Sequence, residues 1–76
     1  MKTRDVLDLV ESELTRASVI YPPIASAHEG IAIIEEEFLE LRAEVFIKSS
    51  QRRPEDLRKE AKHLAAMAIR FMVDLT

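Results

Sequence analysis

The chain has 76 residues, a length that accommodates one domain at most, so we expect a single domain over residues 1–76. Its composition is 47% hydrophobic and 33% charged with a single Gly, which favours a compact helical domain over a disordered chain or a β-sandwich. The net charge of −3 provides no bulk attraction to nucleic acid, and the absence of Cys excludes disulfides and thiolate metal sites.

The N-terminal segment "MKTRDVLDLV" is too acidic for a signal peptide, and every apolar run is far shorter than the roughly 18 residues of a membrane span. We therefore expect a cytoplasmic protein with no membrane partner. The same segment begins the first predicted helix, which runs from about Thr3, as N-cap, to Ala17. Its apolar stripe at helical spacing is Val6, Val10, Leu14 and Ala17. Asp8 and Glu11 lie on the opposite, solvated side.

The segment Tyr21, Pro22 and Pro23 stops the first helix, because proline lacks an amide donor and restricts the residue before it. We expect Tyr21 to be a packing anchor at this junction. The second helix is predicted to start after Ser26, with Glu29 completing a capping box, and to reach about Lys48. Its expected apolar stripe is Ile31, Ile34, Phe38, Leu41 and Val45. We expect His28, in the first turn, to be a surface residue.

The third helix is predicted from Pro54 to about Leu75, after the loop "SSQRR", because proline is well suited to the first helical position. Its main apolar stripe is Leu57, Ala61, Leu64, Ala65, Ala68, Met72 and Leu75. Further apolar residues lie off this stripe, so the helix should be buried from more than one side. We therefore predict an all-α bundle of three helices completed by oligomerisation to a homodimer or homotetramer. The cluster Met67, Phe71 and Met72 is expected in the core or at a subunit interface, and we favour the interface.

Acidic side chains form a row on each of the last two predicted helices. At 100° per residue, one helix places Glu29, Glu36, Glu37, Glu40 and Glu44 within an arc of about 100°. The next helix places Asp56, Glu60, His63 and Met67 along one border of its apolar stripe. Antiparallel packing would bring the two rows together, and a divalent cation would relieve their repulsion. The alternative is an ordinary solvated acidic face.

These residues also carry a resemblance to a known family. The stretches "HEGIAIIEEEFLELRAEVF" and "LRKEAKHLAAMAIRFMVDL" resemble the MazG-like, all-α NTP pyrophosphohydrolase superfamily, whose signature is E-x-x-E, a spacer, then E-x-x-D. Glu37 and Glu40 match the first half, with Glu36 before them, and Glu60 matches the second. The resemblance implies an oligomeric helical bundle that cleaves a nucleoside triphosphate between its α and β phosphates with Mg²⁺, giving a monophosphate and pyrophosphate.

His63 occupies the position of the signature's Asp. Imidazole is a weaker ligand for Mg²⁺ than a carboxylate and suits Mn²⁺, Zn²⁺ or Ni²⁺ better, so His63 would alter the metal or mark a site without turnover. Asp56, one turn before Glu60, is a possible replacement carboxylate. The alternative for His63 is a half-buried polar residue that is hydrogen-bonded to a neighbouring Glu.

The resulting site hypothesis assigns a role to each candidate residue. The metal ligands are Glu37, Glu40, Glu60 and His63, and Glu36 would orient the attacking water as a base. The loop residues Lys48, Arg52 and Arg53 would contact phosphate oxygens, unless they form only a solvated basic turn. Two functions remain open: a metal-dependent pyrophosphohydrolase, and a non-catalytic helical assembly module that kept the bundle and lost the reaction.

Overall fold

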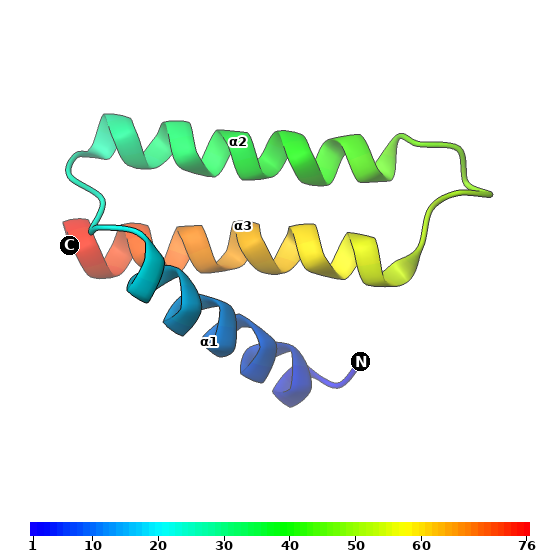
Figure 1. The fold of residues 1–76 in the computed structure, drawn as a ribbon, viewed down its shortest axis with the longest axis horizontal. Coiled ribbons are helices and arrows are strands. Elements are labelled where there is room, and N and C mark those ends of the chain that lie inside the picture. The colour runs from blue at the N-terminus through cyan, green and yellow to red at the C-terminus, as the bar shows by residue number, and fades with distance from the viewer.

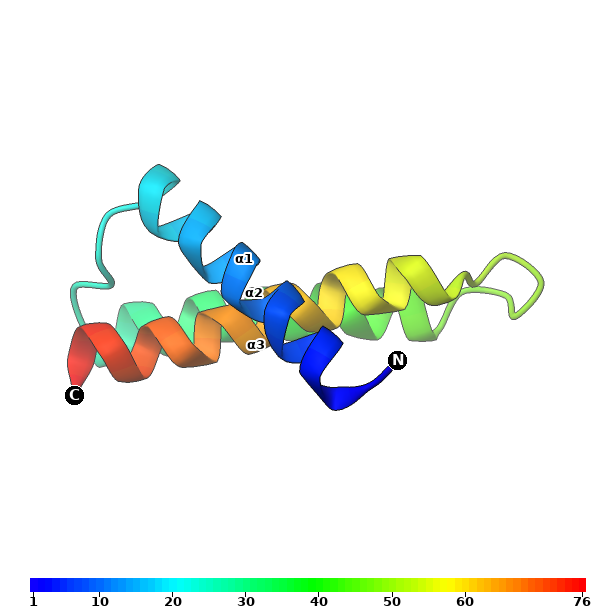
Figure 2. The same ribbon diagram turned by 90° about the horizontal axis from the view of Figure 1, so that it is seen from below.

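The protein is a three-helix structure without strands, as the sequence predicts. The computed structural model describes all 76 residues and contains α1 (Thr3–Ile20), α2 (Ala27–Val45) and α3 (Pro54–Leu75) (Figure 1). Helices α2 and α3 form an antiparallel hairpin, and α1 crosses α3 obliquely on the side away from α2 (Figure 2). The central helix α3 therefore packs on both neighbours, whereas α1 does not pack on α2. No helix combines the length and the apolar content that crossing a membrane requires.

The N-termini of α2 and α3 follow the predicted signals, with one shift. The Ser26 hydroxyl accepts a hydrogen bond from the Glu29 amide at 3.1 Å, as an N-cap should. The Glu29 carboxylate accepts a hydrogen bond of 3.1 Å from the amide of Ala25, one residue earlier than in a capping box. Pro54 is the first residue of α3, as predicted.

Other predicted helix ends were wrong. The carbonyl of Lys2 accepts the first helical bond of α1, from the Val6 amide, so Lys2 and not Thr3 is the N-cap. Helix α1 continues to Ile20, three residues beyond Ala17. Helix α2 ends at Val45 and does not reach Lys48. The Arg52 guanidinium donates to the Val45 carbonyl at 3.0 Å, which satisfies an acceptor that the helix leaves open at its end.

The core is small and lies where α1 crosses α3. The buried hydrophobic residues are Val10, Ala17, Ile24, Ala66 and Met67. Ala17 and Ala66 have no exposed surface and lie in one cluster with Met67, against which Ile33 and Ile34 of α2 also pack. The predicted apolar stripe of α1 was thus correct at Val10 and Ala17. The small side chains of Ala17 and Ala66 let α1 approach α3 closely.

Helix α2 is rotated relative to its predicted orientation. Ile31, Phe38 and Val45 of the expected core stripe are 56%, 51% and 40% exposed. Gly30 is buried instead, and a Cβ there would lie 2.5 Å from the Phe71 ring, so the missing side chain is what lets that ring approach α2. On a helical wheel this rotation points Glu37 at α3.

The predicted stripe of α3 was also displaced. Ala61, Ala68 and Met72 are exposed, whereas Ala66, Met67 and Arg70 are buried. Met67 belongs to the chain's own core, which corrects its assignment to a subunit interface, because α1 covers this side of α3.

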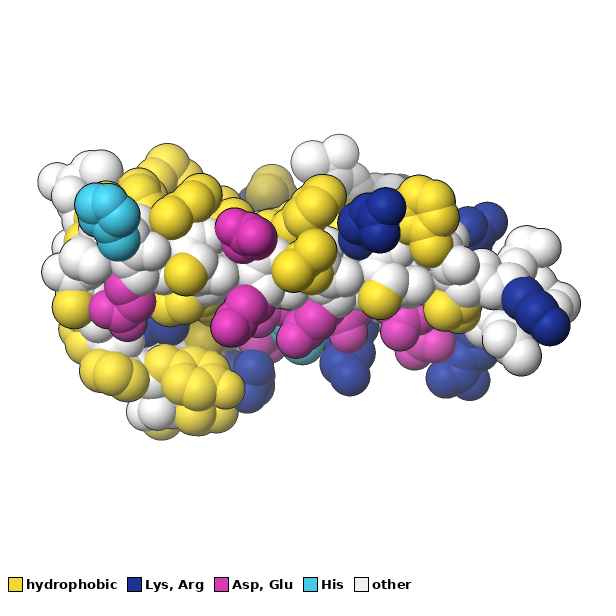
Figure 3. All heavy atoms as spheres, turned by 90° about the horizontal axis from the view of Figure 1, so that it is seen from above, with side chains coloured by type: hydrophobic (Ala, Val, Ile, Leu, Met, Phe, Trp, Pro, Cys, Tyr) yellow, Lys and Arg dark blue, Asp and Glu magenta, His cyan; other side chains and the backbone are white.

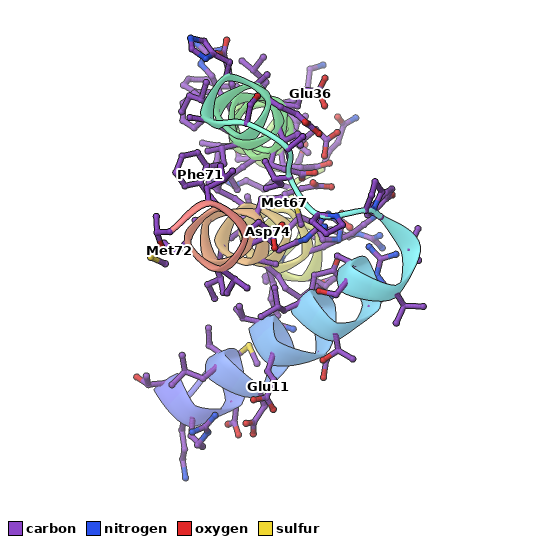
Figure 4. The ribbon with its side chains drawn as sticks, turned by 90° about the vertical axis from the view of Figure 1, so that its left-hand side faces the viewer. Glu11, Glu36, Met67, Phe71, Met72 and Asp74 are labelled. Atoms are coloured by element: carbon purple, nitrogen blue, oxygen red, sulfur yellow. The ribbon has the colours of Figure 1, made fainter.

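Two faces of the helical hairpin differ in character. We call the exposed side chains of Ile31, Phe38, Val45 and Met72 the outer apolar face. Viewed from the α2 side, hydrophobic side chains gather along one edge of that helix and acidic ones along the other (Figure 3). The end-on view places Phe71 and Met72 on the side of the hairpin opposite Glu36 (Figure 4). The acidic row therefore lies away from the outer apolar face.

The segment between α1 and α2 is held by two polar side chains of α3. Arg70 is buried and donates to the carbonyl oxygens of Tyr21 at 3.3 Å and Pro22 at 2.7 Å. The Asp74 carboxylate accepts from the amide of buried Ile24 at 2.8 Å. The Tyr21 ring is 52% exposed, so its carbonyl, and not its ring as expected, anchors this junction.

Candidate metal centre

The structure brings together the four side chains that the sequence selected as metal ligands. Glu37 and Glu40 come from α2, and Glu60 and His63 come from the facing part of α3. One potential ligand atom from each lies within 4.8 Å of all the others. The i,i+3 spacing places each pair on one side of its helix, and the antiparallel hairpin makes the two pairs face each other.

Burial makes this cluster electrostatically unfavourable without a counter-charge. The Oε2 atoms of Glu37 and Glu60 have almost no accessible surface and no hydrogen-bond partner. Burial, reinforced by the neighbouring Glu40 and Glu60 carboxylates, raises the pKa of Glu37 from 4.5 to about 7. The site thus contains buried oxygen acceptors that no donor of the protein satisfies.

His63 lies between this cluster and a carboxylate from α1. Its Nδ1 is 3.7 Å from Glu60 Oε2 and 3.9 Å from Glu37 Oε2. Its Nε2 is 3.6 Å from Glu13 Oε1. Glu13 is only 5% exposed and accepts two hydrogen bonds from Arg16, at 2.5 and 2.9 Å. These bonds hold the pKa of the Glu13 carboxyl below its usual value.

Glu13 is the residue near the site that sequence reasoning missed. The spacing in the sequence could have revealed it. Glu13 lies three residues after Val10 and four before Ala17, which places it on the same face of α1 as that buried pair. A carboxylate in the apolar stripe of a helix requires a partner within the fold. Here the partner is Arg16, with His63 close by.

A cavity of about 450 Å³ connects the carboxylate cluster to an apolar wall. Glu36, the predicted base, is exposed and lies at the acidic end with Glu37 and Glu40. The apolar wall consists of Tyr21, Ile24, Ile33 and Met67, and the Arg16 and Arg70 side chains also line the cavity. With a cation held by the carboxylates, this cavity has room for a ligand that has an anionic end and an apolar end.

The loop cations are not part of this cavity. Lys48, Arg52 and Arg53 lie in the connection between α2 and α3, at the end of the hairpin (Figure 1), and none of them lines it. Arg53 pairs with Asp56 at 3.1 Å, so Asp56 is engaged outside the cluster that it was considered to complete. A phosphate contact by the loop stays a prediction. The sequence did not predict that Arg16 and Arg70 would line the cavity.

The donor set fits a divalent cation. Two ligands of one octahedral ion, each about 2.1 Å from it, are ~3.0 Å apart when adjacent and ~4.2 Å apart when opposite. The His63 Nδ1 distances of 3.7 and 3.9 Å to Glu60 and Glu37 lie between these two values, and they exceed a direct hydrogen bond. A pair at 4.8 Å, the upper limit in the cluster, would contract by ~0.6 Å to occupy opposite positions and by ~1.8 Å to occupy adjacent ones, through rotation of the glutamate side chains.

No family model, curated protein or solved structure matches the chain.

Proposed function

We propose that the chain is a metal-dependent nucleoside triphosphate pyrophosphohydrolase of the MazG-like type, which forms a nucleoside monophosphate and pyrophosphate. One observation carries this proposal: buried carboxylate oxygens of Glu37 and Glu60, without hydrogen-bond partners, lie beside a cavity large enough for a small ligand. The signature resemblance at Glu37, Glu40 and Glu60 supports the same reaction class.

The four clustered side chains and Glu36 supply the chemistry in this proposal. Glu37, Glu40, Glu60 and His63 hold Mg²⁺ or Mn²⁺, which, when bound, neutralises phosphate charge and lowers the pKa of a coordinated water. Glu36 is exposed to the cavity and can accept a proton from the attacking water.

The remaining cavity walls suit the rest of a nucleotide. The ring of Tyr21 and the side chains of Ile24 and Ile33 offer an apolar surface to the base, and Arg16 adds positive charge at the cavity. This division into an acidic end and an apolar wall supports a substrate that carries both a phosphate chain and an aromatic group.

A homo-oligomer, dimer or tetramer, completes the proposed enzyme. Only five hydrophobic residues are buried in the chain, and none of the larger side chains is fully buried. The outer apolar face leaves Ile31, Phe38, Val45 and Met72 substantially exposed. A second copy packed on this face would leave the acidic side of the hairpin open to substrate, because the two lie on opposite sides.

A non-catalytic assembly module is the second candidate. It is favoured by His63, which replaces the Asp of the family signature and lies 3.6–3.9 Å from carboxylate oxygens of Glu13, Glu37 and Glu60. A protonated imidazole there would offset the carboxylate charge without any ion. In that case the cluster would be structural, and the outer apolar face would be the functional part of the molecule.

Pyrophosphate release separates the two candidates. The wild-type chain is incubated with a panel of nucleoside triphosphates and Mg²⁺ or Mn²⁺, beside Glu37→Gln and Glu40→Gln. Glu35→Gln is the matched control, since Glu35 is an exposed carboxylate on the same helix that does not line the cavity. The enzyme proposal predicts release by wild type and control and its loss in both site variants. No release with any triphosphate would leave the assembly module.

A further inference from the structure

We propose that Glu13 is a positioning residue that fixes His63 through its Nε2 atom and thereby gives the metal centre a preference for Mn²⁺ over Mg²⁺. The inference rests on the proposed metal centre and goes beyond it, because it adds a residue of α1 and a metal preference that the carboxylates alone would not produce.

The two ring nitrogens of His63 face carboxylates on different sides of the ring. Nε2 faces the Glu13 carboxylate at 3.6 Å, and Nδ1 faces the carboxylate oxygens of Glu60 and Glu37 at 3.7 and 3.9 Å. A neutral imidazole carries one N–H and one lone pair. An ionised carboxylate accepts but does not donate, so carboxylates on both sides compete for the imidazole proton. With a cation on the Glu37 and Glu60 oxygens, Glu13 is the acceptor that remains, which favours the N–H at Nε2 and leaves the lone pair at Nδ1 for the cation. That lone pair points toward the ligand cluster.

Glu13 is fixed well enough to orient another side chain. It is 95% buried, and both of its oxygens accept hydrogen bonds from Arg16. A movement of about 0.7 Å would close the 3.6 Å gap to the 2.9 Å of an ordinary N–H···O bond. Such a carboxylate behind a metal-bound histidine sets its tautomer and raises its basicity, and its loss typically costs 10–100-fold in metal affinity.

The metal preference follows from the ligand type. Three carboxylates suit both Mg²⁺ and Mn²⁺, whereas an imidazole in the set favours the transition ion. Because His63 occupies the position where the signature has Asp, an all-carboxylate comparison is available in the same chain through His63→Asp. Glu13 should affect the ratio of Mn²⁺ to Mg²⁺ affinity only when residue 63 is a histidine that it can orient.

Calorimetric titration of each metal alone tests the inference. Wild type should bind Mn²⁺ at least ~10-fold more tightly than Mg²⁺. Glu13→Leu should lose ~10-fold or more in Mn²⁺ affinity with little change for Mg²⁺. Glu13→Gln, whose amide oxygen still accepts a hydrogen bond, should retain most of the Mn²⁺ affinity of wild type. In a His63→Asp background the preference should fall, and adding Glu13→Leu should not change it further.

The outcomes distinguish the inference from the proposed function. Failure of wild type to bind either ion would overturn the metal centre itself. An unchanged ratio of Mn²⁺ to Mg²⁺ affinity in Glu13→Leu, with both ions still bound, would overturn only the role of Glu13. Should Glu13→Leu fail to fold, ¹⁵N chemical shifts of His63 in wild type saturated with Mg²⁺, which is diamagnetic, decide. A proton on Nε2 alone supports the inference, and a proton on Nδ1 contradicts it.

Discussion

Replacing Glu37 by Gln should stabilise the metal-free protein at alkaline pH. In the folded chain the pKa of Glu37 is raised from 4.5 to about 7, chiefly by burial. The folded state therefore holds a proton that the unfolded state releases between these values. Stability contributed by the neutral carboxyl is present at low pH and is lost as the pH rises through about 7. Gln has the shape of the neutral carboxyl and does not ionise, so the variant should escape this loss.

The size of the effect follows from the shift. One pKa unit corresponds to 1.36 kcal/mol, and a rise from 4.5 to about 7 gives an upper value of about 3 kcal/mol. Part of the Glu37 side chain reaches solvent, which screens the charge, so we expect about 1–2 kcal/mol at pH 8. In a domain of this size, 1 kcal/mol moves Tm by roughly 4–8 °C.

Thermal unfolding followed by circular dichroism at pH 5 and pH 8, in EDTA and at one protein concentration, measures the effect. Glu37→Gln should melt above wild type at pH 8 and close to it at pH 5, and added Mn²⁺ should stabilise wild type only. Glu36→Gln, an exposed carboxylate of the same cavity, is the control and should stay within ~0.5 kcal/mol of wild type. A variant that is less stable than wild type at pH 8 without metal would refute the reasoning.

Three further predictions concern the fold and the assembly. Gly30→Ala should cost about 1 kcal/mol in a denaturant melt, because a Cβ only 2.5 Å from the Phe71 ring outweighs the gain in helix propensity; a more stable variant would contradict the packing. Asp74→Ala should cost about 1–2 kcal/mol in the same melt by removing the acceptor of the Ile24 amide, and an unchanged midpoint would argue against this anchor. Phe38→Lys should shift sedimentation from an oligomer to a monomer while the circular dichroism stays helical; a wild-type monomer would contradict the assembly.

The sequence predicted the helices well because their signals are local. Ser26 and Pro54 mark helix starts through their own backbone chemistry, and both were correct. The i,i+3 pairs that end at Glu40 and His63 were also local, and antiparallel packing together with the rotation of α2 brings them close to each other. At the end of α2 the Val45 carbonyl accepts from Arg52, seven residues further on, a contact that no signal within the helix reveals.

Rotation of the helices was not predictable in the same way. The apolar stripe of α2 was assumed to face the core, and Ile34 does pack there. A hairpin that packs through Gly30, however, turns Glu37 inward and Phe38 outward. Which face packs depends on the small residues at the contacts, Ala17 and Ala66 among them, and not on hydrophobicity alone. The same rotation buries part of the acidic row, so it determines the electrostatics of the site.

Binding of Mn²⁺ in solution tests the central claim most directly. The electron paramagnetic resonance signal of free Mn²⁺ is measured as the ion is titrated into wild type and into Glu60→Gln, which removes charge from a buried carboxylate while keeping its shape. The metal centre predicts saturable loss of the free-ion signal with wild type and weak or no loss with the variant. Equal signals with wild type, with Glu60→Gln and with buffer would contradict it.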